Sequence, residues 1–407
     1  MSTNIPSSTL QFGRYLAAII SRSDGSYIWV DNVHDSDSVV PSLGSSASMK
    51  FTTTAQLVNA PAALSLTIYN PDPLIYDVAR SEGALVQLIA GYLGVTDPSD
   101  ANQQFGSTNF NFPPPDATYS QAQISAIASR NLQTLQHYFP KMDVSVIFNG
   151  TVAQAKVGRE NGTDTYVEII GIDGDFLYLN GFVSTSIPAG TGQRSQMNQI
   201  TTFVQNDITN NLRQGAYSPY SVAFGNLPED GVLLHRGQVH FGKYTDILHR
   251  FAANNNADFY IQNNTPTFLS RNDAVLTYTT VISSSTGMIG LPVQTIDGIK
   301  VRTLLNPHII QGILVQLTTK DIQPATTDIT AQGTSAINER LSPIDNGIEG
   351  KYKVLVATHN GHTRDHEWYT EIICYSQEQQ STSGSIGGEP NSSNTYYKGI
   401  LNPNVWY

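Results

Sequence analysis

Three histidines lie close together near the carboxyl end of the chain, at His359, His362 and His366. Imidazole nitrogens are common ligands of zinc and other transition metals. These three fall in a polar segment, residues 358–367, with no second group of ligands close by in the sequence, whereas metal sites need supporting groups around their ligands. We interpret the segment as a surface hairpin loop and expect neither a metal nor a cofactor.

Two carboxylates, Glu168 and Glu371, raise the possibility of acid–base chemistry of the glycosidase type, which needs two carboxyl groups about 5–10 Å apart. They occupy matching positions in two separate segments, and an enzyme seldom needs its acid twice in separate domains. We therefore expect both to pair with basic or backbone groups in a structural role. The sequence lacks G-x-S-x-G, H-E-x-x-H, P-loop and dinucleotide-binding fingerprints. We predict that the protein is not an enzyme.

The elements that carry these residues are two copies of one hairpin. Residues 351–375 alternate in the period-2 pattern of a strand, pass through a polar stretch containing Gly361, and resume as a second strand. Residues 151–170 have the same plan, with Gly158 and Gly162 in the polar stretch. The returning strands read Tyr-Val-Glu-Ile-Ile from Tyr166 and Tyr-Thr-Glu-Ile-Ile from Tyr369.

A second signature precedes each hairpin. The first copy has Asn70-Pro71 and then Gly83, followed by Ala-Leu-Val-Gln-Leu; the second has Asn306-Pro307 and then Gly312, followed by Ile-Leu-Val-Gln-Leu. Two signatures recurring in the same order indicate a duplicated domain. Two copies do not make a solenoid, which needs three or more. We predict a mainly β fold with an α+β insert: two duplicated β-barrels, or paired sandwiches, plus a small α+β middle domain.

Composition narrows the class of protein. The 407 residues are 40% hydrophobic and 14% charged, with a net charge of −11, and show no basic excess of the kind a general nucleic-acid binder carries. Cys374 is the single cysteine, so a disulfide framework and a cysteine zinc site within one chain are excluded. The start of the sequence has no secretory signal pattern, and no apolar run is long enough to span a bilayer. We expect a soluble protein made in a reducing cytoplasm, without membrane insertion.

The predicted organisation has four parts. Residues 1–185 form the first module, with an insertion at 94–138 that carries a helix over residues 121–136. Residues 190–272 form the middle domain, in which a helix leads into a small hairpin, and residues 275–375 form the second module. Residues 376–407 are a flexible Ser/Gly/Gln linker ending in an aromatic arm. The arm is predicted either to dock on a partner or to pack on its own subunit, through Tyr396, Tyr397, Trp406 and Tyr407.

With these segments in view, the chain resembles the baseplate hub proteins of contractile-tailed bacteriophages, which are similar to the hub part of type VI secretion spike proteins. The resemblance is carried by residues 66–70, 304–312 and 360–370, and by the helix and hairpin at 246–269. Gln311 departs from it, because hubs often have proline there, and the insertion and the C-terminal arm have no counterpart that fixes their roles.

This resemblance implies that the two duplicated β-barrels are tail-tube-like. It also implies a homotrimer whose partners are the tail tube protein, the central spike protein and other baseplate proteins. The trimer would adapt a six-fold tube to a three-fold spike and form part of the DNA-ejection conduit, with phage DNA bound only in transit. Its place would be the tail baseplate of the virion, assembled in the host cytoplasm. Two alternatives stay open at this point: a tail-associated peptidoglycan hydrolase and a glycan-binding β-sandwich virion protein.

Overall fold

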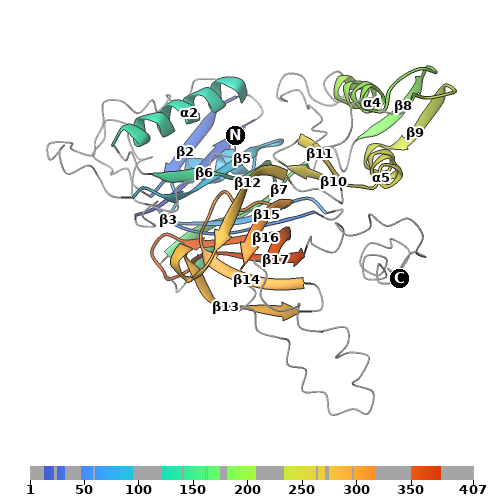
Figure 1. Ribbon diagram of the computed structural model, residues 1–407. Helices are drawn as coiled ribbons and strands as arrows, with labels where there is room; N and C mark the ends of the chain where they lie inside the picture. The colour runs from blue at the N-terminus through green and yellow to red at the C-terminus, as the bar shows by residue number, and fades with distance from the viewer. Residues whose placement is uncertain are drawn as a thin grey trace, which may run out of the picture.

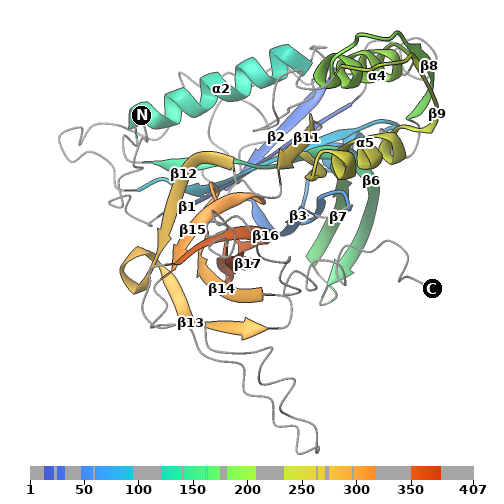
Figure 2. The same cartoon turned by 45° about the vertical axis from the view of Figure 1, so that its right-hand side comes forward.

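The computed structural model shows a mainly β protein, and its described residues form one sheet of 13 strands and two further two-stranded sheets (Figure 1, Figure 2). The prediction of a mainly β fold with an α+β insert is confirmed. The structure describes residues 13–22, 25–32, 47–57, 60–94, 121–138, 142–160, 162, 164–174, 181–207, 233–262, 265–270, 275–295, 298–317 and 350–376.

The described residues of the first half of the chain form seven strands and two helices. They are β1 (Arg14–Ser21), β2 (Tyr27–Asp31), β3 (Ser48–Gln56), β4 (Ala63–Tyr69), α1 (Pro73–Ala79), β5 (Leu85–Tyr92), α2 (Gln121–Tyr138), β6 (Asp143–Glu160) and β7 (Asp164–Ile172). Helix α1 was missed by the sequence interpretation, which used the Asn-Pro-Asp-Pro run only to end β4. The same run starts the helix, because the Asp72 side chain accepts the N–H of Leu74 and Pro73 fits the first turn.

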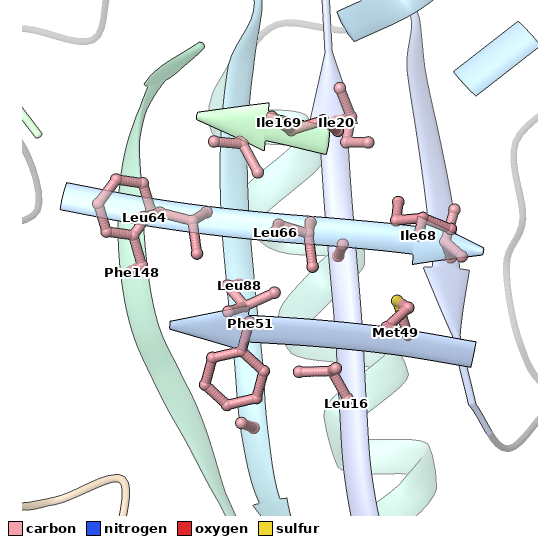
Figure 3. Packing of buried hydrophobic residues seen from close by; sticks show 14 of the residues in the cluster. Leu16, Ile20, Met49, Phe51, Leu64, Leu66, Ile68, Leu88, Phe148 and Ile169 are labelled. Carbon is pink, nitrogen blue, oxygen red and sulfur yellow. The ribbon is translucent and has the colours of Figure 1, made fainter. Parts of the chain in front are cut away.

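The main core lies where β3 and β4 cross over β1 and β5. Alternate residues of β4, Leu64, Leu66 and Ile68, point toward Leu16 and Leu88 on the crossing strands (Figure 3). β1 is buried on both faces, because α2 covers its other side. Ile124 and Ala128 of that helix are buried in a second hydrophobic cluster, which includes Tyr15, Ala17 and Ile19 of β1. The helix predicted over residues 121–136 is confirmed.

The second half contributes the remaining strands of the large sheet. They are β12 (Val275–Ile282), β13 (Met288–Thr295), β14 (Gly298–Leu304), β15 (Ile313–Leu317), β16 (Gly350–His362) and β17 (Trp368–Ser376), with a 3-10 turn, η3 (Ser284–Thr286), before β13. Their buried faces enclose a core of their own, which includes Val301, Val315, Tyr352 and Ile372. Cys374 lies in this core, where burial raises the pKa of its thiol.

In the sequence, an α+β unit lies between the two halves, and it has a separate core. Its elements are β8 (Phe182–Ile187), α4 (Gln193–Asp207), β9 (Gln238–Lys243), α5 (Tyr244–Asn254), β10 (Ala257–Gln262) and β11 (Thr265–Ser270). The predicted helix-to-hairpin passage is confirmed by α5, β10 and β11. β8 pairs with β9, so this unit begins upstream of residue 190. Figure 1 shows α4, β8, β9 and α5 together at one end of the molecule.

The two halves follow the same strand plan. In the first half the strands are ordered β3-β4-β7-β6-β5, and in the second half β13-β14-β17-β16-β15. In both halves a Leu-Val pair lies at or near the start of the last strand of this order, β5 or β15, at an equivalent register: Leu85 pairs with Thr151, and Leu314 pairs with Lys353. The halves differ in the next strand, since β1 runs antiparallel to β5 whereas β12 runs parallel to β15.

Candidate assembly interface

The two halves are joined by direct strand pairing between β16 and β3. The pairing is antiparallel and runs from Val356 opposite Gln56 to His362 opposite Lys50. It makes the halves one continuous sheet, in the order β13-β14-β17-β16-β3-β4-β7-β6. Side chains add to the backbone ladder: the hydroxyl of Thr52 donates to Oδ1 of Asn360 at 2.9 Å.

Aromatic packing anchors the end of this junction. Trp368, at the start of β17, stands edge-on to Phe51 of β3 with ring centroids 5.8 Å apart, and edge-on to Tyr92 at 6.4 Å. The guanidinium of Arg14 lies 5.5 Å from the centre of the Trp368 ring and donates to the carbonyl of His362. The rings belong to the core of the first half, so the β16–β17 hairpin is held by packing as well as by pairing.

The three histidines do not share a site. His359 lies inside β16 and is 4% exposed, with Nδ1 2.9 Å from the hydroxyl of Thr370, so its interpretation as a surface-loop residue was wrong. Burial lowers the pKa of His359 to about 4, and the ring is therefore neutral at pH 7. His362 accepts N–H groups of the following turn, and His366 is exposed. Among the described residues, no group of three His, Cys, Asp or Glu side chains is placed to hold a metal ion.

The two carboxylates each meet basic groups on the sheet. Glu371 on β17 is bound by Lys300, 3.2 Å away, and by Arg302, both from the neighbouring strand β14. Partial burial opposes ionisation of Glu371, but hydrogen bonds from Arg302 and Lys300 outweigh it and lower the pKa. Glu168 on β7 faces Lys156 of β6 at 3.9 Å. The carboxylates lie in different halves of the sheet, one on β7 and the other on β17, each with its own cations.

The two glycines of the duplicated signature, Gly83 and Gly312, have backbone conformations that favour glycine. Gly83 and Gly312 precede equivalent strands, and both have positive φ, +71° and +87°, where a side chain is disfavoured. The two Asn-Pro pairs differ by one position along the fold. The backbone N–H of Asn70 donates to Thr165, whereas the matching bond of the second half comes from Leu305, so Asn306 and Pro307 stand one residue further on.

The remaining signature residues lie on the returning strands. Tyr166 on β7 pairs with Tyr69, and its ring centroid is 6.5 Å from that of Tyr69. Tyr369 on β17 pairs with Leu304, and Arg302 lies 4.5 Å above its ring. The predicted docking arm, with Tyr396, Tyr397, Trp406 and Tyr407, lies outside the described residues.

One face of the continuous sheet turns away from both cores and is mostly polar, although Ile170 and Ile373 also lie on it. Its side chains alternate with the buried ones along each strand, as a half-buried sheet requires. They include Lys300, Arg302, Glu371, Thr358, Asn360, Lys50, Thr52, Thr54, Ser65, Thr67, Glu168 and Lys156. Cations and carboxylates are paired here: besides the pairs of Glu168 and Glu371, Lys50 binds Glu367 at 3.2 Å.

Several strands of the large sheet have a described neighbour on one side only over part or all of their length, among them β2, β12, β13 and the distal part of β6. The edges of β13 and β6 belong to strands that have counterparts at the β16–β3 junction. β13 pairs with β14 on one side, and no described strand pairs with its other side. The pairing of β6 with β5 extends from Asp143 to Thr151 and stops there. The part from residue 152 to Glu160 pairs with β7 alone among the described strands. Sequence reasoning missed both edges, because strand order is a tertiary property; the bulge-forming Gly290-Leu291-Pro292 run was the one local signal of an edge.

The chain matches no protein-family model and no curated protein sequence. It is similar to several solved structures. The tail protein from Neisseria meningitidis MC58 aligns over 89% of this chain and 96% of its own, with 8% identity and a TM-score of 0.45. The 43 kDa tail protein of prophage MuSo2 from Shewanella oneidensis aligns over 89% and 97%, with 6% identity and a TM-score of 0.45.

A type VI secretion system component from E. coli aligns over 84% of this chain and 76% of its own, with 9% identity and a TM-score of 0.41. At such low identities and TM-scores, these likenesses assign neither a family nor a function. In the part of the chain that the structure describes, no helix is both long and apolar enough to cross a membrane.

Proposed function

We propose that the chain is a structural protein of a contractile tail, a hub that assembles as a homotrimer at the baseplate. The observation that carries this proposal is the β16–β3 junction, through which two halves with the same strand plan become one sheet. A chain that contains two similar modules, joined edge to edge, contributes two units to a ring. Three chains then supply six similar units around a three-fold axis.

Such a ring adapts one symmetry to another. One rim presents six similar modules to a six-fold tail tube protein, and the other presents three copies of the chain to a three-fold central spike protein. We assign strands β1 to β7 and β12 to β17 to the two modules, and the elements from β8 to β11 to the middle domain. The signature residues, from Asn70 to Glu371, then have structural roles, and the protein needs no reaction and no cofactor.

The polar face of the sheet suits the wall of a passage. Hydroxyl and amide side chains of β3 and β16 are already satisfied across the strands, and the cations of this face are paired with carboxylates. A wall of that kind offers no unbalanced basic surface to hold a polyanion. In this proposal phage DNA passes through the ring during ejection without being retained, and the protein resides in the tail of the virion.

The test is the mass and image of the full chain, alone and with its spike protein. Sedimentation should give three chains per particle, and electron microscopy should show a three-fold ring of six similar densities around a central passage. A monomer or a two-fold dimer would overturn the proposal. Clearing of peptidoglycan in a zymogram, or saturable binding on a glycan array, would favour the rival hydrolase or glycan-binding function.

The aromatic arm has its own test. We propose that residues 395–407 dock on a partner in the baseplate, so their deletion should leave the trimer intact and reduce its retention of a partner protein. Unchanged assembly with the tube, spike and other baseplate proteins would remove the arm from the proposal.

A further inference from the structure

β6 and β13 each have an edge that no described strand pairs with, and in the duplicated strand plan they correspond to β16 and β3, which pair with each other inside the chain. Both β6 and β16 are long strands whose first part pairs with one neighbour, β5 or β15. Beyond that part, β16 pairs with β3 as well as with β17, whereas β6 pairs with β7 alone among the described strands. Lys156 lies opposite Glu168, and Thr358 lies opposite Glu371, so Lys156 and Thr358 hold equivalent positions. Both strands also break register at the same point, after Val152 in β6 and after Val354 in β16.

The equivalence extends to β3 and β13. Thr54 pairs with Ala63 and Thr295 with Gly298, each at the start of the following strand, while Met49 and Met288 stand at the other end. β13 differs by a break in register between Ile289 and Val293, where β3 runs straight. The segment of β16 that pairs with β3 therefore corresponds to the unpaired segment of β6, and β3 corresponds to β13.

Burial shows what the edges lack. His359 on β16 is 4% exposed because β3 lies beside it, whereas Val157, at the equivalent position on β6, is 55% exposed. On β13, Ile289, Leu291 and Val293 are 40%, 51% and 42% exposed. Ile289 and Val293 stand where β3 has Lys50 and Thr52, on the polar face, so a strand added to this edge would lie beside them without covering that face. Four of the exposed large apolar side chains of the described residues thus lie on these two edges. Unpaired apolar edge strands add strands from another chain unless something covers them.

We propose that β6 of one chain pairs with β13 of a neighbouring copy, in the antiparallel register that β16 and β3 use within the chain. Transferring that register places Lys156 opposite Thr295, Gly158 opposite Val293 and Glu160 opposite Ile289 of the neighbour. The extra residues of β13, 290–292, then lie opposite Arg159. This inference rests on the proposed function, because it names the surface through which the ring closes.

The contact is head to tail, since β6 and β13 are different surfaces. Such a contact gives a closed ring when the rotations add to a full turn, and an open fibre when they do not. If the contact between chains repeats the contact within a chain, every module is related to the next by the same rotation. A ring of three chains then needs about 60° per module. In Figure 2 the β6–β7 hairpin (green) and β13 (orange) lie apart on the molecule, as two ends of such a unit must.

A cysteine pair tests the register. Antiparallel partners have Cα atoms about 4.5–5.5 Å apart, which a disulfide can span. The full chain with Lys156→Cys and Thr295→Cys should, on oxidation, give a covalent species of three chains on a denaturing non-reducing gel. Each single variant should remain a single chain. The native Cys374 is fully buried and does not compete.

The matched control uses the junction inside the chain. Thr54→Cys with Thr358→Cys replaces the equivalent pair, whose hydroxyl oxygens are 3.5 Å apart. Oxidation of this variant should produce a single chain that migrates faster, with no linked oligomer. This control shows that the oxidation conditions suffice at a junction whose geometry is known.

A second variant measures the energy of the contact without a cross-link. Val157→Asp should weaken trimer formation about tenfold or more in sedimentation equilibrium, because it puts a charge where an apolar side chain is buried. Val239→Asp, at a position 80% exposed on the separate β8–β9 sheet, should leave it unchanged.

The outcomes separate the inference from the proposed function. A three-chain particle that neither cross-links through residues 156 and 295 nor responds to Val157→Asp would overturn this interface and leave the hub standing. A chain that stays monomeric at all concentrations would overturn both. Cross-linked ladders that extend beyond three chains would show that β6 and β13 pair but that the ring does not close at three.

Discussion

Two glycines of the duplicated hairpins provide a sharp test of how the β16–β3 junction is packed. Gly361 on β16 and Gly158 on β6 occupy neighbouring positions of the two copies. A Cβ atom built on Gly361 would lie within 3.0 Å of ring atoms of both Phe51 and Trp368. A Cβ atom on Gly158 would come equally close to the ring of Tyr166. The nominal overlap is the same, but the surroundings differ.

The cost of each added methyl group follows from whether its neighbour can move. Phe51 is 1% exposed and Trp368 is 2% exposed, and the two rings pack on each other, so neither can give way without disturbing the core. Overpacking of that kind costs about 1–3 kcal/mol. We therefore expect Gly361→Ala to destabilise the protein by about 2 kcal/mol. Tyr166 is only partly buried and its phenol end can swing, so Gly158→Ala should cost about 0.5 kcal/mol or less.

Urea unfolding followed by tryptophan fluorescence measures both, and Trp368 reports directly on the junction. With a slope of about 2–3 kcal/mol per molar urea, the Gly361→Ala midpoint should fall by about 0.7–1 M. Phe51→Leu makes room for the new methyl group, so the double variant should lose less stability than the two single variants together. Equal midpoints for Gly361→Ala and Gly158→Ala, at one protein concentration, would refute the packing assigned to the junction.

Three further predictions concern charge and backbone. Because burial depresses the folded-state pKa of His359 to about 4, the unfolded chain binds more protons between that value and about 6.5, and stability must fall as the pH falls. Between pH 7.5 and 5 the loss from this residue should be about 2 kcal/mol, and His359→Val should flatten the pH dependence of unfolding by that amount; an unchanged slope would contradict the burial. Glu371→Gln should cost about 0.5–1 kcal/mol at low salt and less in 1 M salt, whereas Glu168→Gln, with one distant lysine, should be nearly neutral. The Glu371 contribution is present above the ordinary pKa of a glutamate and disappears as the pH drops through its lowered value. Gly83→Ala and Gly312→Ala should each cost about 1 kcal/mol, since both glycines have positive φ, and a thermal shift that spares either one would count against the shared turn geometry.

The turns of the hairpins show where reading a sequence reaches its limit. The polar residues after Thr358 indicated a loop, yet β16 continues to His362, and β6 likewise continues to Glu160. Thr358 and Asn360 are polar because that face of the strand turns away from the core. His359 lies on the other face, buried beside β3, where its ring nitrogen has a partner in Thr370. A strand whose one face is exposed to solvent carries many polar and small residues. When its partner strand is unknown, that sequence pattern is easily mistaken for a loop.

The α+β unit shows the opposite case. The apolar spacing of Tyr244, Ile247, Leu248 and Phe251 predicted α5, and all four side chains are buried. The β8–β9 sheet escaped notice, since its strands are separated by α4 and by more than 40 residues of chain (187 to 238) and neither has a strongly alternating pattern. Local periodicity identifies elements that carry their own apolar face, and it says little about strands whose partner is distant.

The sequence by itself determined that the chain is mainly β, that two of its hairpins share a plan, and that its two matched carboxylates belong to different segments. These are local or repeated patterns, and period-2 alternation and recurring Tyr-x-Glu-Ile-Ile runs carry them. Only the tertiary structure decided that β16 pairs with β3, about 300 residues away, and left β6 and β13 with one side unpaired among the described strands. Backbone hydrogen bonds between strands are indifferent to side-chain identity, so the choice of neighbour is made by packing of whole faces such as the contact of Phe51 with Trp368.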